Sequence, residues 1–378
     1  MEKHSLASAL PSAAATISPS VPHQRLGASA AAQEWPAGSV RETWILTGLS
    51  ALVLVGAYHD GWAHNRDLTE SFFTIYHAIL YGALNLTTLF VLGLMVRNHR
   101  RGYPWIRSLP QGYEVTFLGL ACFTVFGLVD LLWHLAFGIE KAAESLVSPP
   151  HLLLSIGGGL IGCGALAWAY RPSVRTNDPA VRYLVPVLLG FVLSATTFIT
   201  QFYHAWGRTG AAAGYFTKPG IRLEEAPFTQ EIASVLLQTV VLMGMVTLFL
   251  RHRTLPLGSM TIILGINTAL LTYMKSDRLA TGALPLFIAA VVAGVLIDAV
   301  LWRLQPTAAR PVPLRVFCFV APLILYSCYY LALQLAGGGI GWVVHLWTGG
   351  ILIAGIAGWM TSYVVVPPKS LELQAGDR

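Results

Sequence analysis

The chain has 378 residues, of which 55% are hydrophobic and only 11% are charged, and its mean hydropathy is +0.61. Soluble domains carry about 25% charged residues, so this composition excludes a soluble globular protein and indicates a multi-pass membrane protein. The net charge of +6 does not indicate a nucleic-acid partner, because basic residues in such chains mostly mark cytoplasmic loops.

Apolar runs dominate the chain after a polar start. Residues 1–40 are rich in Ala, Ser and Pro, which predicts a disordered tail. Ten runs then follow that are long enough to cross a bilayer as helices, which takes about 20 residues each. They lie at 42–63, 72–96, 114–137, 149–170, 181–205, 229–250, 257–274, 281–303, 313–335 and 340–364. The sequence therefore predicts an all-α fold, a polytopic integral membrane bundle of about ten transmembrane helices with repeated helix hairpins.

Arginines predict how these helices are oriented. They gather in alternate connections, after the second, fourth, sixth and eighth runs. Because basic loops stay in the cytoplasm, we expect both termini to be cytoplasmic, including a tail at 367–378, in the inner or plasma membrane of the cell. The membrane part then divides into 41–172, 173–255 and 256–366.

The first of these divisions carries polar side chains where apolar ones are expected. In HDGWAHNRDLTESFFTIYH, Asp60 and His64 are four residues apart, so they share one face of a helix. His77 stands near the start of the next run, seven residues after Glu70. Two histidines and a carboxylate that converge at a helix hairpin form a metal-ligand set.

The pattern recurs in DLLWHLAFGIEKAAESLVSPPH. Asp130 and His134 are again four apart, and His151 again follows a glutamate, Glu144, by seven residues. We expect Glu70 and Glu144 either to orient the ligand rings as outer-shell partners or to cap the next helix. The two sets should lie near each other, on adjacent hairpins at the extracytoplasmic face.

A third hairpin, at 173–255, resembles an altered copy. His204 takes the place of His64 and His134, Thr200 replaces the aspartate, and Glu231 stands where the second histidine would be. This hairpin predicts either a degenerate site or part of an ion path. In the second hairpin, the glycines at 157–159 predict close helix packing and not a phosphate loop.

A metal role competes with plainer interpretations of the same residues. Ionisable groups inside a membrane are costly and usually functional, and the ligand types recur at matching positions in two hairpins, which favours metal. A hydrogen-bonded structural cluster, a proton relay and haem ligation are the alternatives.

At these residues the sequence resembles the C subunit of the copper membrane monooxygenases, the particulate methane and ammonia monooxygenase group. DGWAH followed by FFTIYH matches that family's DGxxH…FTxxH segment, and DLLWH followed by SLVSPPH is similar to its neighbouring set, with Asp130 where the family has asparagine. The match covers about residues 55–160. More widely, the chain resembles multi-span bacterial membrane proteins that carry a WH…FG…SPPHLLL segment.

The resemblance implies copper as the cofactor, one or two copper sites, and oxidation of a small apolar substrate. From the ligand set alone, zinc or iron is also open, and with zinc the chain would be a hydrolase of lipid-like bonds. A metal-handling or haem-binding protein that is no enzyme is a further alternative. The expected partners are the lipid bilayer and either other membrane subunits or further copies of the chain.

Overall fold

The structure is a computed structural model that describes residues 35–68, 71–138, 144–171, 173–174, 178–213 and 225–368. The described part consists of helices and contains no sheet, only two isolated bridges. Eight of its helices are long and apolar enough to cross a membrane. They are α1 (Val40–His64), α2 (Ile75–Arg100), α3 (Tyr113–Phe137), α5 (Pro149–Ala169), α9 (Glu225–Leu250), α11 (Ala283–Leu304), α12 (Pro311–Ala336) and α13 (Val344–Val365).

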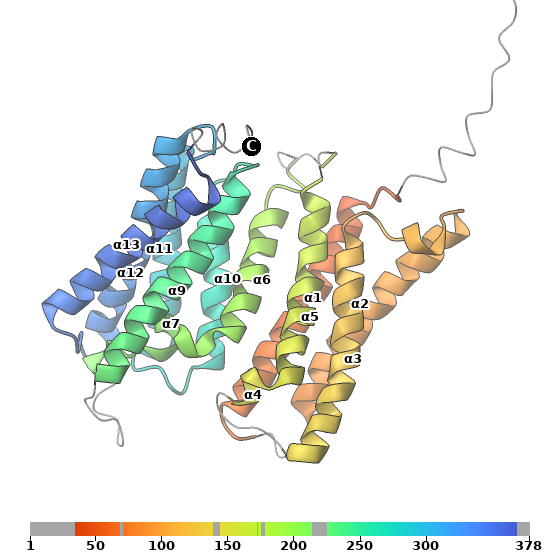
Figure 1. The fold of residues 1–378 in the computed structure, drawn as a ribbon, viewed down its shortest axis with the longest axis horizontal. Helices are drawn as coiled ribbons and strands as arrows, with labels where there is room; N and C mark the ends of the chain where they lie inside the picture. The colour runs from red at the N-terminus through yellow and green to blue at the C-terminus, as the bar shows by residue number, and fades with distance from the viewer. Residues whose placement is uncertain are drawn as a thin grey trace, which may run out of the picture. The chain divides into compact units, whose positions relative to one another are not determined.

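Two further apolar helices are shorter, α6 (Leu184–Ile199) and α10 (Ser259–Met274). Each has 16 residues and so extends about 24 Å, less than the roughly 30 Å of a hydrocarbon core. They correspond to the fifth and seventh predicted runs. The eight long helices and these two short ones occupy the places of the ten predicted spans (Figure 1), and eight of the ten have the length and composition to cross a bilayer.

The fifth run, 181–205, is not one helix as predicted. α6 ends at Ile199, and the chain continues through a 3-10 turn, η2 (Gln201–Tyr203), and one helical turn, α7 (Ala205–Arg208). A side chain from a later helix stabilises this break. Gln238 on α9 donates hydrogen bonds to the hydroxyl of Thr200 at 3.0 Å and to the carbonyl of Tyr203 at 2.7 Å. Carbonyl groups freed inside an apolar bundle need such partners.

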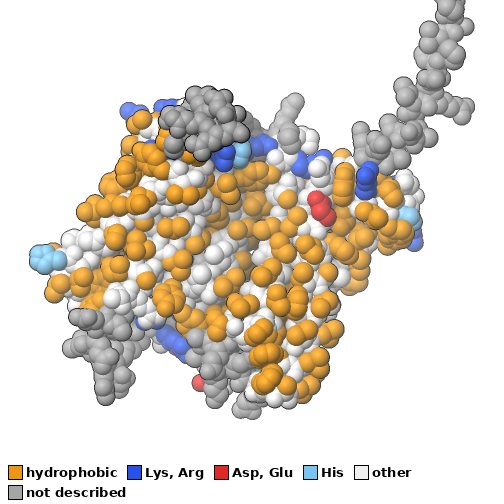
Figure 2. All heavy atoms as spheres, viewed as in Figure 1, with side chains coloured by type: hydrophobic (Ala, Val, Ile, Leu, Met, Phe, Trp, Pro, Cys, Tyr) orange, Lys and Arg blue, Asp and Glu red, His pale blue; other side chains and the backbone are white. Residues whose placement is uncertain are grey.

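The sides of the helices expose large apolar side chains. Leu89, Leu128, Leu132 and Val364 are each more than 60% exposed. Figure 2 shows hydrophobic side chains covering the helix sides on one face, with most Lys and Arg near the helix ends. Exposed apolar surface of this extent indicates contact with lipid, so the chain is a multi-pass membrane protein.

α3 and α5 form the closest helix pair in the N-terminal half. A Cβ atom at Gly119 would lie 2.7 Å from the carbonyl oxygen of Gly157, and one at Gly157 would lie 2.9 Å from the backbone nitrogen of Phe123. Only glycine allows this approach. The packing predicted for the glycines at 157–159 therefore holds at Gly157, whereas the next two glycines line a cavity.

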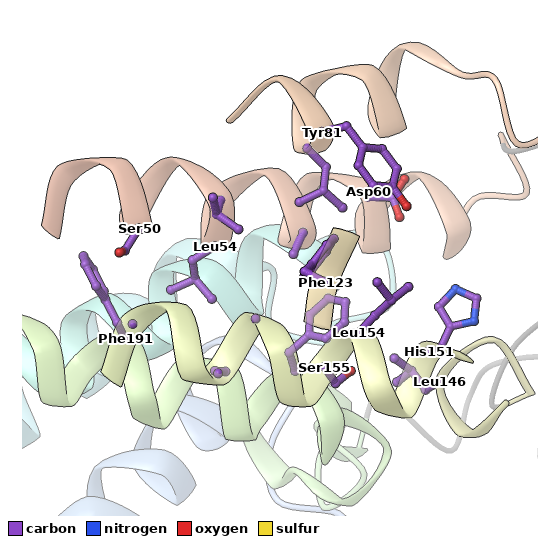
Figure 3. Close-up of a pocket in the computed structure, with 18 of the residues that line it drawn as sticks. Ser50, Leu54, Asp60, Tyr81, Phe123, Leu146, His151, Leu154, Ser155 and Phe191 are labelled. Carbon is purple, nitrogen blue, oxygen red and sulfur yellow. The ribbon is translucent and has the colours of Figure 1, made fainter. Parts of the chain in front are cut away.

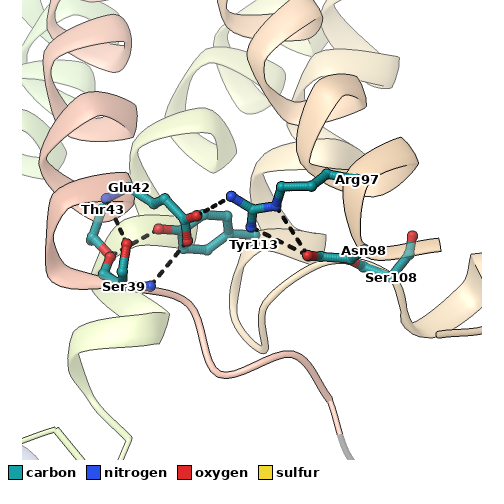
Figure 4. Close-up of polar contacts among 7 residues, drawn as sticks. All are labelled: Ser39, Glu42, Thr43, Arg97, Asn98, Ser108 and Tyr113. Carbon is teal, nitrogen blue, oxygen red and sulfur yellow. Dashed lines mark hydrogen bonds and ion pairs between the residues drawn. The ribbon is translucent and has the colours of Figure 1, made fainter. Parts of the chain in front are cut away.

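A polar network joins α1, α2 and α3 at the ends opposite the predicted ligands (Figure 4). Ser39 and Glu42 form a capping box at the start of α1, and Arg97 of α2 pairs with Glu42. The hydroxyls of Thr43 and Tyr113 lie 2.8 Å apart. These contacts fix the relative positions of the three helices that carry five of the six predicted ligands.

Candidate metal centre

The first three predicted ligands come together where α1 ends and α2 begins. Asp60 and His64 lie on the last two turns of α1, and His77 lies on the first turn of α2. Nε2 of His64 is 3.6 Å from Asp60 Oδ2, and Nε2 of His77 is 3.5 Å from Asp60 Oδ1. We refer to Asp60, His64 and His77 as the first trio.

The second set forms the same arrangement between α3 and α5. Nε2 of His134 lies 3.4 Å from Asp130 Oδ2, and Nδ1 of His151 lies 3.4 Å from Asp130 Oδ1. We refer to Asp130, His134 and His151 as the second trio. It is more enclosed than the first, because Asp130 is only 2% exposed. In each trio, one ligand atom per residue lies within 4.8 Å of the other two.

The contacts of the His77 ring show which of its two nitrogens carries the proton and which has the lone pair. Its Nδ1 lies 2.7 Å from the carbonyl oxygen of Phe72. Because a carbonyl can only accept, Nδ1 carries the proton and donates it. In the neutral ring, Nε2 then directs a lone pair toward Asp60, whose carboxylate is also an acceptor.

Two acceptors that face each other need a cation between them. The four nitrogen–oxygen distances, 3.4–3.6 Å, exceed those of N–H···O hydrogen bonds. They are close to the separation of about 3.3–3.4 Å expected for two ligands that each lie about 2.0–2.1 Å from a tetrahedral ion. Asp130 Oδ1 is buried and accepts no hydrogen bond from the described residues. The side chains of both trios thus fit a metal ion.

Both trios open onto one cavity. Asp60 and His77 from the first trio and Asp130 and His151 from the second all line it (Figure 3). Phe72 connects the trios from the side, since its ring stacks on His77 at 5.1 Å between centroids and lies 6.2 Å from the ring of His134. Ions bound in the two trios would therefore be neighbours.

The outer partners suggested by the sequence are not tested by the structure, which shows other contacts to the histidines. Glu70 and the side chain of Glu144 lie outside the described residues. The carbonyl of Phe72 holds His77, and two residues at helix ends contact the second trio: Gly138 O lies 3.2 Å from Nδ1 of His134, and Ser148 Oγ lies 2.7 Å from Nδ1 of His151. Ser148 stands just before Pro149, at a helix start, where serine is favoured. This position is the feature of the sequence that could have pointed to its contact with His151.

A second contact that sequence reasoning missed holds the end of α1. Asn65, the residue after His64, accepts a hydrogen bond from Lys275 Nζ at 3.0 Å on its side-chain oxygen and one from Arg278 at 2.6 Å on its carbonyl. Both donors come from the connection between α10 and α11. This contact fixes the helix end on which the first trio depends.

The third hairpin does not form a trio. His204 has an extended backbone (φ −141°, ψ 109°) outside any helix, so it does not share a helix face with Thr200. Glu231 is 1% exposed and binds a cation of the chain itself, with Arg208 Nε 3.2 Å from Oε1. The predicted likeness of this hairpin to the first two therefore stops at its sequence.

No family model matches the chain, nor does any curated protein or any solved structure. The helices define its class, a multi-pass membrane protein. The likeness to the copper membrane monooxygenases rests on the quoted motifs alone.

We expect Ser148→Ala to strengthen metal binding at the second trio by about 10-fold, because Ser148 Oγ lies 2.7 Å from Nδ1 of His151, the nitrogen that faces Asp130, and competes with an ion for its lone pair. Affinity at the first trio should not change. The measurement is a metal titration of both sites. Thr88→Ala is the matched control, because its hydroxyl donates only to Leu84 O within α2. Equal affinities in Ser148→Ala and in the control would contradict this competition.

Proposed function

We propose that this chain is a membrane metalloprotein that binds one copper ion at each of the two trios. The observation that carries the proposal is a pair of acceptors that face each other in the first trio. The lone pair of His77 Nε2 faces Asp60 Oδ1 at 3.5 Å, too far for a hydrogen bond. A structural hydrogen-bond cluster would instead bring a donor to within about 3.2 Å of the carboxylate.

Two imidazoles and one carboxylate suit copper, zinc or iron as divalent ions. Haem is less suitable. A carboxylate lies within 3.6 Å of both rings of the first trio, in the space that a porphyrin held between His64 and His77 would need. Copper is preferred over zinc because of the resemblance of DGWAH and FFTIYH to the copper membrane monooxygenases.

The proposed activity is oxidation of an apolar substrate. Copper bound in the trios would supply one-electron and oxygen chemistry. The chain's own residues have three tasks. The histidines and aspartates hold the ions, the carbonyls of Phe72 and Gly138 orient two of the rings, and the apolar side chains of the shared cavity exclude water.

The test is to purify the full chain in mild detergent and to measure bound metal together with its spectrum. We expect two copper ions per chain and a paramagnetic signal with nitrogen hyperfine splitting. Stoichiometric zinc without a visible band would replace the oxidase proposal with a hydrolase. A Soret band would indicate haem, and the absence of any tightly bound transition metal would remove the proposal.

The arginine pattern supports an extracytoplasmic position for the trios. In a background without the native cysteines, we expect Leu68→Cys, close to the first trio, to react with an impermeant thiol reagent added from outside. Arg101→Cys, at the other end of α2, should react only after the membrane is opened. The reverse result would invert the topology.

A further inference from the structure

The cavity shared by the trios continues far beyond them. It reaches Ser50 on α1 and Gly162 on α5, each ten or eleven residues from the trio ligand on its own helix, Asp60 or His151. At 1.5 Å per residue, the cavity therefore runs about 15 Å along the helices. Figure 3 shows Ser50 and Phe191 at one end and Asp60 and His151 at the other.

Glycines keep this cavity open. Gly159 and Gly162 line it from α5, and a Cβ atom at either position would have no other atom within 4 Å. Its volume of about 100 Å³ is several times the roughly 10–15 Å³ that one water requires. Spread over about 15 Å, such a volume is narrow, which suits one alkyl chain better than the two chains of a phospholipid.

The two ends of the cavity differ in chemistry. Away from the trios, the walls are mostly apolar side chains such as Leu54, Phe123 and Phe191, with Ser155 and, at the far end, Ser50 as polar exceptions. At the trio end, Asp130 Oδ1 is buried without a hydrogen-bond donor. In the metal-free chain that end calls for a donor and its two carboxylates disfavour an anion, whereas ions in the trios would occupy that oxygen and offset both charges.

We propose that the cavity binds a single-chain amphiphile with an uncharged hydrogen-bond-donating head, of the fatty-alcohol class, with the head beside the trios and the chain along α5. The orientation matches that of an amphiphile in the same leaflet. The trios lie at helix ends, where lipid head groups are found, and Ser50 and Gly162 lie toward the middle of their helices. The inference rests on the proposed function only in making this ligand the substrate, since binding itself requires no metal.

The experiment uses the full chain, freed of metal, in lipid nanodiscs and a photoreactive dodecanol with a diazirine at mid-chain. We expect irradiation to label peptides of α1, α5 and α6 that line the cavity, and unlabelled dodecanol to compete. In Gly159→Leu and Gly162→Leu, the new side chains should fill the cavity and reduce labelling about 10-fold. Gly265→Leu on α10 is the matched control, because that glycine is also half-buried with no atom near its Cβ position and does not line the cavity.

Labelling that is unchanged in both cavity variants, or equally reduced in the control, would overturn the proposal, as would stronger competition by the anion dodecanoate than by dodecanol. Metal content, measured on the same preparation before the metal is removed, separates this proposal from the previous one. Cavity labelling in a protein that binds no copper would remove the metal proposal and leave the amphiphile site intact. Copper binding without competed labelling would do the opposite.

Discussion

His64→Ala is expected to lose one of two bound metal ions, and His134→Ala is expected to lose the other. Each substitution removes one of three ligands from a trio and leaves its aspartate without the bound cation. The double variant should bind no metal tightly. The measurement is metal stoichiometry per chain after dialysis, with the copper spectrum recorded for each variant.

The matched control is His99→Ala. His99 also lies on α2, but it stacks on Trp105 at the opposite end of the helix and bonds the carbonyl of Tyr103. Glu70→Gln and Glu144→Gln should also retain most of the metal, because an outer partner typically changes affinity by about 10–100-fold without removing the site. Unchanged stoichiometry in both His64→Ala and His134→Ala would reject the metal interpretation and favour a structural cluster.

The grouping of the trios could be predicted from the sequence because it depends on local geometry. Asp60 and His64 share a face through helix periodicity, and the short loop that follows leaves His77 few places to go. What fixes the ring of His77 could not be predicted. A sequence does not show which carbonyl a ring will reach, and the partner is Phe72 O, not an acid.

The end of α6 could not be predicted either, for a different reason. After Ile199 the polar residues Thr200, Gln201 and His204 are interspersed with aromatic ones, a mixture that a helix end also tolerates, and no proline or glycine stands among 200–206 to mark a stop. The helix ends there because Gln238, far along the chain, bonds the hydroxyl of Thr200 and the carbonyl of Tyr203. Tertiary contacts override local propensity here, so the alignment of His204 with His64 on helix spacing failed.

The third hairpin shows how a buried carboxylate is stabilised without a bound ion. Glu231 occupies the place of the second histidine, yet its partner is the Arg208 guanidinium. Gly210 contributes as well, since its amide bonds the carboxylate and a side chain at that position would collide with Oε1. Because the Arg208 side chain supplies the positive charge, no metal ion is needed to balance the charge of Glu231.

Arg208→Gln should therefore destabilise the fold by about 3–5 kcal/mol, because it leaves a carboxylate that is 1% exposed without its cation. Glu231→Gln should cost less, since the Arg208 side chain is 22% exposed and keeps some solvent. The double variant should recover most of the loss, which a double-mutant cycle of unfolding free energies in mixed micelles would measure. All three variants should still bind two metal ions. A loss of metal in Arg208→Gln, with the fold intact, would show that the third hairpin supports the metal centre; a stability change below about 0.5 kcal/mol would show that the ion pair is not structural.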